Sequence, residues 1–526
     1  MPKQRINDYK IPVSINSLTT PPGPAVTTTG GKGESSATPS KRERPEGLES
    51  RASTSSSANS ASFLGPRSGT PNRADGVSAH TKFYDDGSAR TDYKKIKLDP
   101  GKSPTEQNLT AAALNGQLQH VRSDGKTAKT DSHFHPTNYS QRGANFGQLT
   151  AMMDQLGVRN TTLMPIPTSI ISPIEDAQRA DRGNHHCGEA YYIPAQFANL
   201  RSNEMTPQIA AQITSRTELV MDTQVDHSLA YRFHNAGMSE AEKSRFDPMV
   251  TGTHLGSPLA PQSLVEKMLQ NKGTFTGIGE VTIHKELVGE MFAGDAQANL
   301  TTRVQSFKDL AAVAGVIGMP MVLHCDVDTL ANNANRGQEG YAPAHLNALR
   351  DLFSSNELAN TNVIWAHGGG LGRFVQEPSA AHTDELNRLL SDNPKLHIDI
   401  SWSHVATQLT NPEAIDRWVN LIEAHPDRFL IGSDSLSPAD ESRWNETFNL
   451  YAEFLDRLQP STQESLLNGN YERVIVDSRP KVREFEEKVL TDNFERTQLL
   501  PTDGPRITAA SLNEYMQANN IQLAPR

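Results

Sequence analysis

The amino-acid sequence predicts an α/β protein, a parallel (β/α)8 barrel that follows a long disordered N-terminal region. Two observations support this class. Residues 17–129 consist mainly of Ser, Thr, Gly, Pro, Ala and Lys without a sustained apolar period, so they bury too little apolar surface to offset the entropy of ordering. After residue 129, short apolar runs alternate with longer amphipathic stretches, as expected of βα units around a parallel sheet.

The predicted organisation has three parts. Residues 1–128 form the disordered leader, residues 129–480 form the barrel, and residues 481–526 form a C-terminal helix and tail. The stretch at about 168–246 is long for a βα connection and is interpreted as an insertion that could cover the site.

The barrel elements follow from the apolar runs and the amphipathic stretches. Strands are expected at 129–135, 160–166, 217–223, 248–254, 275–283, 320–325, 362–367, 395–401 and 428–433. Helices are expected at about 143–156, 260–271, 298–317, 342–354, 380–391 and 412–424, with two more at 441–458 and 481–498 that pack outside the barrel. Nine strands exceed eight by one, so the strand near 217 is assigned to the insertion.

Charge and composition exclude several classes of partner. The formal net charge is -11, and residues 1–130 hold 19 Lys and Arg against 12 Asp and Glu, which leaves -18 for the remainder. The acidic ordered part gives no nucleic-acid signal. No apolar run is long enough to span a membrane. The expected partner is a small-molecule substrate, and the oligomeric state is left open.

The N-terminus and the cysteines bear on localisation. The first residues lack the apolar core of a Sec signal peptide, and the two cysteines, Cys187 and Cys325, are too few for a disulfide framework. The Ser-rich leader resembles that of bacterial type III secretion substrates, although a plain flexible tail explains the same composition. The expectation is a protein that is cytoplasmic or is secreted by a non-Sec route.

The first candidate ligands are His133 and His135, in the run Asp131-Ser132-His133-Phe134-His135-Pro136. Alternate side chains of a β-strand share a face, so both imidazoles point into the same space and can bind one cation. Taken alone this pair is a weak signal, because two histidines on a polar strand face occur without any metal.

Four later strand ends supply further candidates. Glu280 lies in an apolar run, where a carboxylate is costly unless it is paired or binds a cation, and His324, His367 and Asp434 each close an apolar strand. In a parallel barrel the C-terminal ends of the strands form the active face. Each residue has an ordinary alternative, such as a helix N-cap for Asp434, but their occurrence in this order points to one site.

The series His133, His135, Glu280, His324, His367 and Asp434 resembles that of the amidohydrolase superfamily of metal-dependent TIM-type barrels. The resemblance covers about residues 129–475. The run 277–281, Gly-Ile-Gly-Glu-Val, is similar to the glycine-glutamate strand of TatD-like hydrolases. The run 469–473, Gly-Asn-Tyr-Glu-Arg, is similar to a segment of the branch that contains aminocarboxymuconate semialdehyde decarboxylase.

The resemblance implies a role for each residue. His133 and His135 would bind the more buried cation, Glu280 would bridge two cations, and His324 and His367 would bind the second. Asp434 would touch the first cation and accept a proton from the attacking water. A one-metal alternative would use His133, His135, His324 and Asp434, with His367 polarising the substrate.

The chemistry of these residue types agrees with hydrolysis. A divalent cation lowers the pKa of bound water from about 15.7 toward about 7, and Asp434 beside that water would act as general base. Imidazole and carboxylate ligands suit zinc, manganese, iron or nickel, and the residues do not choose among them. Zinc is the expected ion. Two ions are expected.

Several other polar residues are weaker candidates. Asp326 and Asp328 are expected to be solvated loop acids, with substrate binding as the alternative. The cluster His185-His186-Cys187 could bind a metal itself, although a closed set of four ligands is missing. Near the strand ends lie Asp399, Ser401, Trp402, His254 and His284.

Three functions remain open on the sequence. The first is a metal-dependent hydrolase that cleaves an ester, phosphoester, lactone or amide bond of a small substrate. The second keeps the metal site but makes the reaction a nonoxidative decarboxylation, which Glu280 argues against because a two-cation site suits hydrolysis better. The third is a secreted bacterial effector in which the barrel is mainly an interaction scaffold.

Overall fold

The computed structural model describes residues 129–141, 143, 145–170, 192–193, 197, 200, 204–216, 218–291, 300–375, 380–438, 440–501 and 503–524. The predicted leader at 1–128, the cluster His185-His186-Cys187 and part of the predicted insertion lie outside these residues. Predictions about those segments therefore stay predictions.

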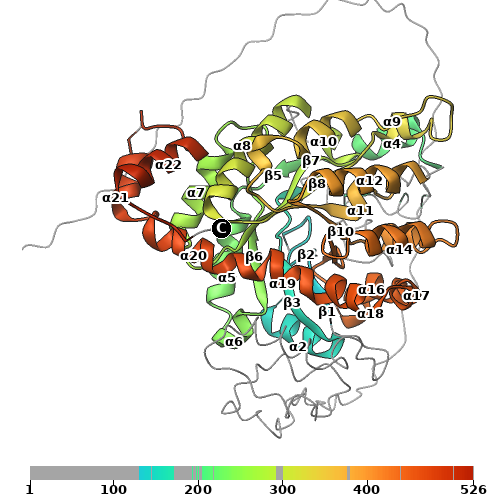
Figure 1. Ribbon diagram of the computed structural model, residues 1–526, viewed down its shortest axis with the longest axis horizontal. Coiled ribbons are helices and arrows are strands. Elements are labelled where there is room, and N and C mark those ends of the chain that lie inside the picture. The colour runs from blue at the N-terminus through green and yellow to red at the C-terminus, as the bar shows by residue number, and fades with distance from the viewer. Residues whose placement is uncertain are drawn as a thin grey trace, which may run out of the picture. The chain divides into compact units, whose positions relative to one another are not determined.

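Eight parallel strands form one sheet with helices around it, which confirms the predicted (β/α)8 class (Figure 1). The strands follow one another around the sheet in chain order, as expected when each pair is joined by a right-handed crossover. They are β1 Lys129–Asp131, β3 Val158–Leu163, β6 Phe246–Val250, β7 Gly277–His284, β8 Met321–Cys325, β9 Val363–Trp365, β10 Leu396–Ile400 and β11 Phe429–Ile431.

Backbone hydrogen bonds join the first strand to the last. The amide of Ser132 donates to the carbonyl of Ile431 over 3.0 Å, and the amide of Asp434 donates to the carbonyl of His133 over 2.8 Å. Just beyond, β2 (Phe134–His135) pairs in parallel with β12 (Ser435–Leu436). This seam closes the barrel beside the candidate histidines.

The predicted barrel helices are present, with ends set by local capping. In α2, for example, the side chain of Asn145 accepts a hydrogen bond from the amide of Gly147, and Gly157 ends the helix at φ 70°. The helix therefore begins after the predicted residue 143. The helices between consecutive barrel strands include α2 Phe146–Leu156, α5 Val225–His234, α6 Glu240–Lys243, α7 Ala260–Gln270, α8 Leu300–Ile317, α10 Leu346–Phe353, α12 Ala380–Asp392 and α14 Ile415–Ala424.

The strand expected near 217 does not belong to the barrel. It is β5 (Leu219–Met221), which pairs antiparallel with β4 (Thr168–Ile170) in a separate two-stranded sheet. Helix α4 (Pro207–Thr214) precedes β5. Shorter elements at the strand ends are η7 Val288–Met291, α9 Leu330–Asn333, η9 Asn356–Leu358, α11 Ala366–Gly370 and α13 Ser403–Leu409.

The two helices expected after the last barrel strand are broken into shorter ones, so those predictions were wrong in extent. The run 441–458 divides at Asn445 and at the buried Tyr451, where ψ is -2° and 0°. The run 481–498 divides because Thr491 caps a new helix through its hydroxyl. The pieces are α15 Glu441–Trp444, α16 Glu446–Leu450, α17 Ala452–Arg457, α20 Arg479–Lys488, α21 Asp492–Phe494 and η12 Glu495–Leu499.

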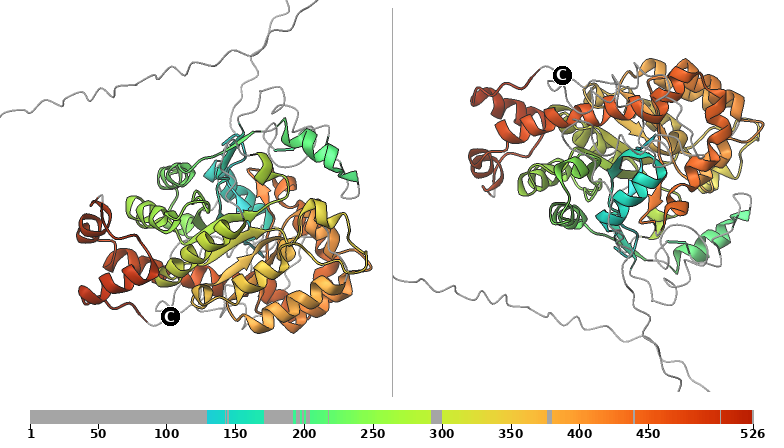
Figure 2. Two further views of the ribbon diagram at one scale, coloured as in Figure 1. Left: turned by 90° about the horizontal axis from the view of Figure 1, so that it is seen from above. Right: turned by 90° about the horizontal axis from the view of Figure 1, so that it is seen from below.

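The C-terminal part of the chain adds helices outside the barrel and contacts to its base. Helix α22 (Ala509–Ala518) lies beside α8, as Figure 2 shows for the red end of the chain. The remaining elements are α18 Pro460–Glu464, η10 Ser465–Gly469, α19 Asn470–Val474 and η11 Val476–Ser478. No helix of the described residues is both long and apolar enough to cross a membrane.

The base of the barrel is filled by apolar side chains and by the segment 471–476. Met249, Val322 and Ile364 from the strands form one buried cluster with Tyr471 and Val474. This cluster leaves the opposite, C-terminal ends of the strands for polar residues.

Asn470 anchors this segment to the last barrel strand. Its side-chain amide donates to the carbonyls of Pro426 and Phe429 over 2.9 and 2.7 Å. The Gly-Asn-Tyr-Glu-Arg run therefore has a structural role at the base of the barrel.

Asn470→Ala is expected to lower the free energy of unfolding by about 2 kcal/mol, because it removes the donor from the buried carbonyl of Phe429 and from the partly buried carbonyl of Pro426. Chemical denaturation measures this change. The matched variant Asn356→Ala, at an exposed position, should stay within about 0.5 kcal/mol of the parent. Equal stability of the two variants would contradict the anchoring role.

Candidate metal centre

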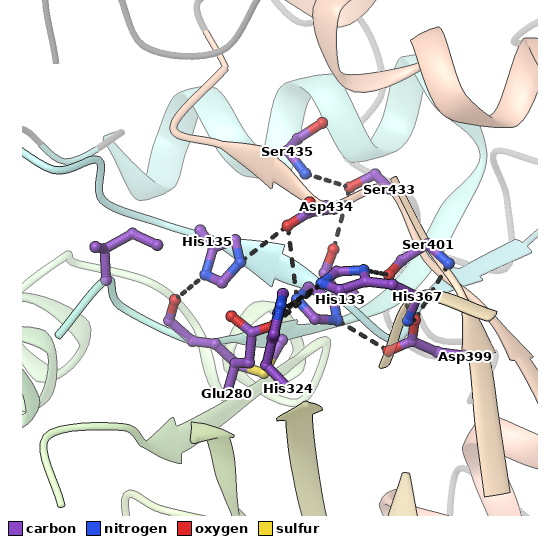
Figure 3. Close-up of polar contacts among 12 residues, drawn as sticks. His133, His135, Glu280, His324, His367, Asp399, Ser401, Ser433, Asp434 and Ser435 are labelled. Atoms are coloured by element: carbon purple, nitrogen blue, oxygen red, sulfur yellow. Dashed lines mark hydrogen bonds and ion pairs between the residues drawn. The ribbon is translucent and has the colours of Figure 1, made fainter. Parts of the chain in front are cut away.

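The six candidate residues from the sequence converge at the C-terminal ends of the barrel strands (Figure 3). All are buried, the most exposed being Glu280 at 6 %. They come from five places around the barrel. His133 and His135 lie at β1 and β2, Glu280 on β7, His324 on β8, His367 directly after β9 and Asp434 after β11.

Two unusual backbone geometries place the ligands. His367 and the three glycines after it, 368–370, all have positive φ, and a Cβ at Gly370 would lie 2.5 Å from the carbonyl of Cys325. Gly279 has φ 137°, and a Cβ there would lie 2.6 Å from that of Val322. Glycine permits the left-handed turn at the first site and the close packing of β7 on β8 at the second.

The first part of the centre joins His133 and His135 to Asp434. The distance from Nε2 of His135 to Oδ1 of Asp434 is 3.1 Å. Nε2 of His133 lies 3.6 Å from the same oxygen and 3.5 Å from Oε1 of Glu280. His133 therefore stands between the two carboxylates.

The second part gathers around Glu280. Its Oε1 lies 2.6 Å from Nδ1 of His324 and 3.1 Å from Nε2 of His367. The two imidazole nitrogens are themselves 3.1 Å apart. One carboxylate oxygen thus meets two ring nitrogens, and Nε2 of His133 approaches the same oxygen.

The outer ring nitrogens of His133 and His135 are each held by an acceptor. Nδ1 of His133 lies 2.9 Å from Oδ2 of Asp399, and Nδ1 of His135 lies 2.7 Å from the carbonyl of Met164. A carboxylate and a carbonyl both require an N–H donor, so they assign the proton to Nδ1 in each ring. The Nε2 atoms then carry lone pairs that face the centre.

His324 and His367 are held in the same way. Nε2 of His324 lies 3.1 Å from Oδ1 of Asp326, and Nδ1 of His367 lies 2.9 Å from the hydroxyl of Ser401. That hydroxyl donates to Asp399, so its oxygen is available as an acceptor for the ring N–H. Inward-facing lone pairs supported by outer hydrogen bonds are the usual arrangement of metal-binding histidines.

This geometry fits a cation. Lone pairs of four imidazoles meet the oxygens of two carboxylates in a buried space, an arrangement of acceptors against acceptors that needs a positive charge between them. Nε2 of His133 is buried and has no hydrogen-bond partner within the part of the chain that the structure describes. Histidine and carboxylate ligands without thiolate suit zinc and similar divalent metals.

Ring and carboxylate positions define two groups of potential ligands that share one residue. One group is His133, His135 and Asp434, and the other is His133, Glu280 and His367. In each group the ligand atoms lie within 4.8 Å of one another. His324 adjoins the second group through its contact with Glu280.

The charges of the centre shift the pKa values in the absence of a metal. Burial lowers the pKa of His133 and His324, but neighbouring carboxylates outweigh it and raise both to about 9. Burial raises the pKa of Glu280, and the positive charges of His324 and Lys285 bring it well below its usual range. Protons on the histidines thus balance the carboxylates when no cation does.

Asp399 and Asp131 organise the centre, although sequence patterns predicted no firm role for either residue. Asp399 accepts hydrogen bonds from the ring of His133 and from the amide of His367, over 2.9 and 3.0 Å. Asp131 accepts bonds from Ser433 and from the indole of Trp444, which brace the barrel seam. A carboxylate inside the apolar strand 396–400 was the available signal for Asp399.

The expectation that Asp326 and Asp328 are solvated was wrong, since they are 1 % and 0 % exposed. Asp326 is buried because it bonds to His324 and to the amide of Glu286. Asp328 accepts from Tyr341, over 2.6 Å, and from backbone amides in its own loop.

The remaining weak candidates lie around the centre. The ring of Trp402 is 5.4 Å from that of His367, centroid to centroid, so it walls the site. His254 lines a cavity next to Glu280. His284 packs against His345 with ring centroids 4.4 Å apart, and burial lowers its pKa to about 4.

Comparison with known proteins finds similarity among solved structures. No family model and no curated protein matches the chain. An amidohydrolase from Burkholderia multivorans, once with bound zinc, aligns at 12 % identity over 66 % of this chain and 99 % of its own, with TM-scores of 0.37 and 0.36. A probable 2-pyrone-4,6-dicarboxylic acid hydrolase from Acinetobacter baumannii aligns at 11 % over 66 % and 99 %, with a TM-score of 0.34.

Metal binding is expected to release protons at pH 7, because His133 and His324 have pKa values of about 9 without metal and must lose their protons to bind it. Apparent affinity for Zn²⁺ should therefore rise between pH 7 and 9. Titration calorimetry in buffers of different ionisation enthalpy counts the protons, about two when both rings are ligands. Binding without proton release at pH 7 would contradict this protonation state.

Asp399→Asn is expected to weaken zinc binding by about 10- to 100-fold, because the amide no longer fixes the ring of His133 as a carboxylate does. Competition with a chromogenic chelator measures the affinity. The matched variant Asp392→Asn, at an exposed helix end, should bind zinc as the parent does. Unchanged affinity in both would show that Asp399 does not support the centre.

Proposed function

We propose that this protein is a metal-dependent hydrolase that uses a metal-activated water to cleave an ester, phosphoester, lactone or amide bond of a small substrate. One observation carries the proposal. Four buried imidazole lone pairs and two carboxylates converge at the C-terminal ends of the barrel strands. A parallel barrel presents its reactive groups at this end.

Two zinc ions are the occupancy that these residues support best. His133, His135 and Asp434 would hold the first, His324 and His367 would hold the second, and Glu280 would lie between them. The hydrogen bond from His367 to Ser401 favours a ligand role for its Nε2, because that nitrogen then carries a lone pair and has no proton to donate to a substrate. This argues against the one-metal alternative, in which His367 polarises the substrate.

Bound there, a divalent cation lowers the pKa of water so that hydroxide is available at neutral pH. Asp434 is the residue placed to handle the proton. Burial raises its pKa, but the contact with His135 and the positive charges of nearby histidines lower it far more, so it is ionised at neutral pH. It would accept a proton from the attacking water and deliver it to the leaving group.

Asp399 and Asp326 act through the histidines. They hold the rings of His133 and His324 with the lone pairs directed inward. The rings therefore need little reorientation when a cation binds. The buried ring of Trp402 beside His367 would help to limit access of bulk water, which would strengthen the electrostatic interactions in the centre.

Asp434→Asn is expected to lower kcat by at least about 100-fold, because the amide cannot accept the proton. His133→Ala should also lower the bound metal, since this residue belongs to both ligand groups. The measurements are metal content by mass spectrometry and turnover of a panel of ester, lactone, phosphoester and amide substrates.

Asp427→Asn is the matched control, because that carboxylate is 60 % exposed and precedes β11 at the other end of the strand. It should keep the metal and the activity of the parent. Purified protein without stoichiometric divalent metal, together with no effect of His133→Ala and Asp434→Asn on metal or turnover, would overturn the proposed function.

A further inference from the structure

A cavity beside the candidate metal centre is lined by basic, neutral polar and apolar side chains. It opens onto Glu280 and is lined by residues that follow the neighbouring strands β3, β6 and β7, and also by Thr168 and Met221 of the β4–β5 sheet. It therefore lies at the same end of the barrel as the candidate ligands. A substrate bound there would have one end beside Glu280.

The charged residues of this cavity are mostly basic. Lys285 and Arg303 line it, and among the described lining residues Glu280 is the one carboxylate. Arg303 is held in place from the first turn of α8 by a hydrogen bond of 3.2 Å to the carbonyl of Ile283. The cavity thus places two cationic side chains beyond the carboxylate that faces the metal centre.

The other polar groups are neutral and suit an anion as well. Thr253 lines the cavity and is 2 % exposed, and its buried hydroxyl has no hydrogen-bond partner among the described residues. A buried hydroxyl without a partner is costly unless a ligand supplies one. Burial and the charge of Arg303 lower the pKa of His254, so its ring is neutral at pH 7 and can donate a hydrogen bond.

Apolar side chains complete the wall. Tyr139, Ile166, Leu255 and Val288 all contribute to the lining. An apolar surface with a few convergent polar groups is typical of a small-molecule site, in which the polar groups fix the orientation of the ligand.

We infer that this cavity binds an anionic substituent of the substrate, a carboxylate or a phosphate on a short apolar body, with Arg303 and Lys285 as its cationic partners and Thr253 as a hydrogen-bond donor. The inference rests on the proposed function and deepens it, because it names the class of substrate. The scissile bond would lie toward Glu280, and the anionic substituent would lie at the far end of the cavity.

Two esters with the same leaving group test the charge preference. The probes are 4-nitrophenyl butyrate, which is neutral, and mono-4-nitrophenyl glutarate, which carries a carboxylate at the acyl end. The zinc-loaded full chain is expected to cleave the glutarate ester with a kcat/KM about tenfold higher or more, as one charged hydrogen bond contributes that much. Arg303→Met should bring the ratio toward one, and Arg303→Lys should retain part of it.

Lys308→Met is the matched control, since Lys308 lies on the same helix and does not line the cavity. It should keep the ratio of the parent, and metal content is measured for every variant. A ratio near one in the parent, or a ratio that Arg303→Met leaves unchanged, would overturn the inference while leaving the proposed function intact.

Binding by calorimetry tests the site without turnover and distinguishes the two anions. Glutarate and inorganic phosphate are titrated into the zinc-loaded parent and into Arg303→Met. Binding at least about tenfold weaker in the variant supports the site, and the anion that binds the parent more tightly identifies the substituent. An anion that binds only to the metals would bind both proteins equally, which would refute the inference even if neither ester were cleaved.

Discussion

The structure depends on one electrostatic constraint, the burial of Glu280 and Asp434 against the lone pairs of four histidines. Acceptors facing acceptors in a dry space repel one another unless a proton or a cation lies between them. Without metal, protons on His133 and His324 fill this role, as their raised pKa values show. A divalent cation would interact with the same oxygens and nitrogens, so its binding would displace the protons from these histidines.

Different strands of the barrel supply the ligands and the groups that hold the ligands in place. The seam between β1 and β11 brings His135 to Asp434, which is 299 residues away in the chain. Strand β10 contributes no direct ligand, yet Asp399 on it holds both the ring of His133 and the backbone of His367. The ligands are therefore fixed from behind by groups on rigid strands, which is how a site avoids the cost of ordering flexible side chains on binding.

Charge also divides the active end of the barrel into two regions. The metal centre is rich in carboxylates, whereas the adjoining cavity carries Lys285 and Arg303 with Glu280 at the border. Opposite potentials side by side orient a polar substrate before any bond is broken, because each end of the molecule is attracted to a different region. In the proposed function, Glu280 would therefore link substrate orientation to metal binding, because it borders both regions.

The sequence by itself determined the class of fold and the six inward-facing residues. The spacing of apolar residues and the local composition predict the strands and helices. A polar residue at the end of an apolar strand indicates the active end of a parallel barrel. The predictions from sequence that failed concern residues whose contacts come from distant parts of the chain. They left Asp326 and Asp328 as solvated acids, extended helices through Tyr451 and Thr491, and gave Asp399 no firm role, because burial and hydrogen-bond partners of these residues come from distant segments. Only the tertiary structure decided which ring nitrogen faces the centre and that a basic cavity adjoins it, since both depend on contacts between strands that the order of residues does not encode locally.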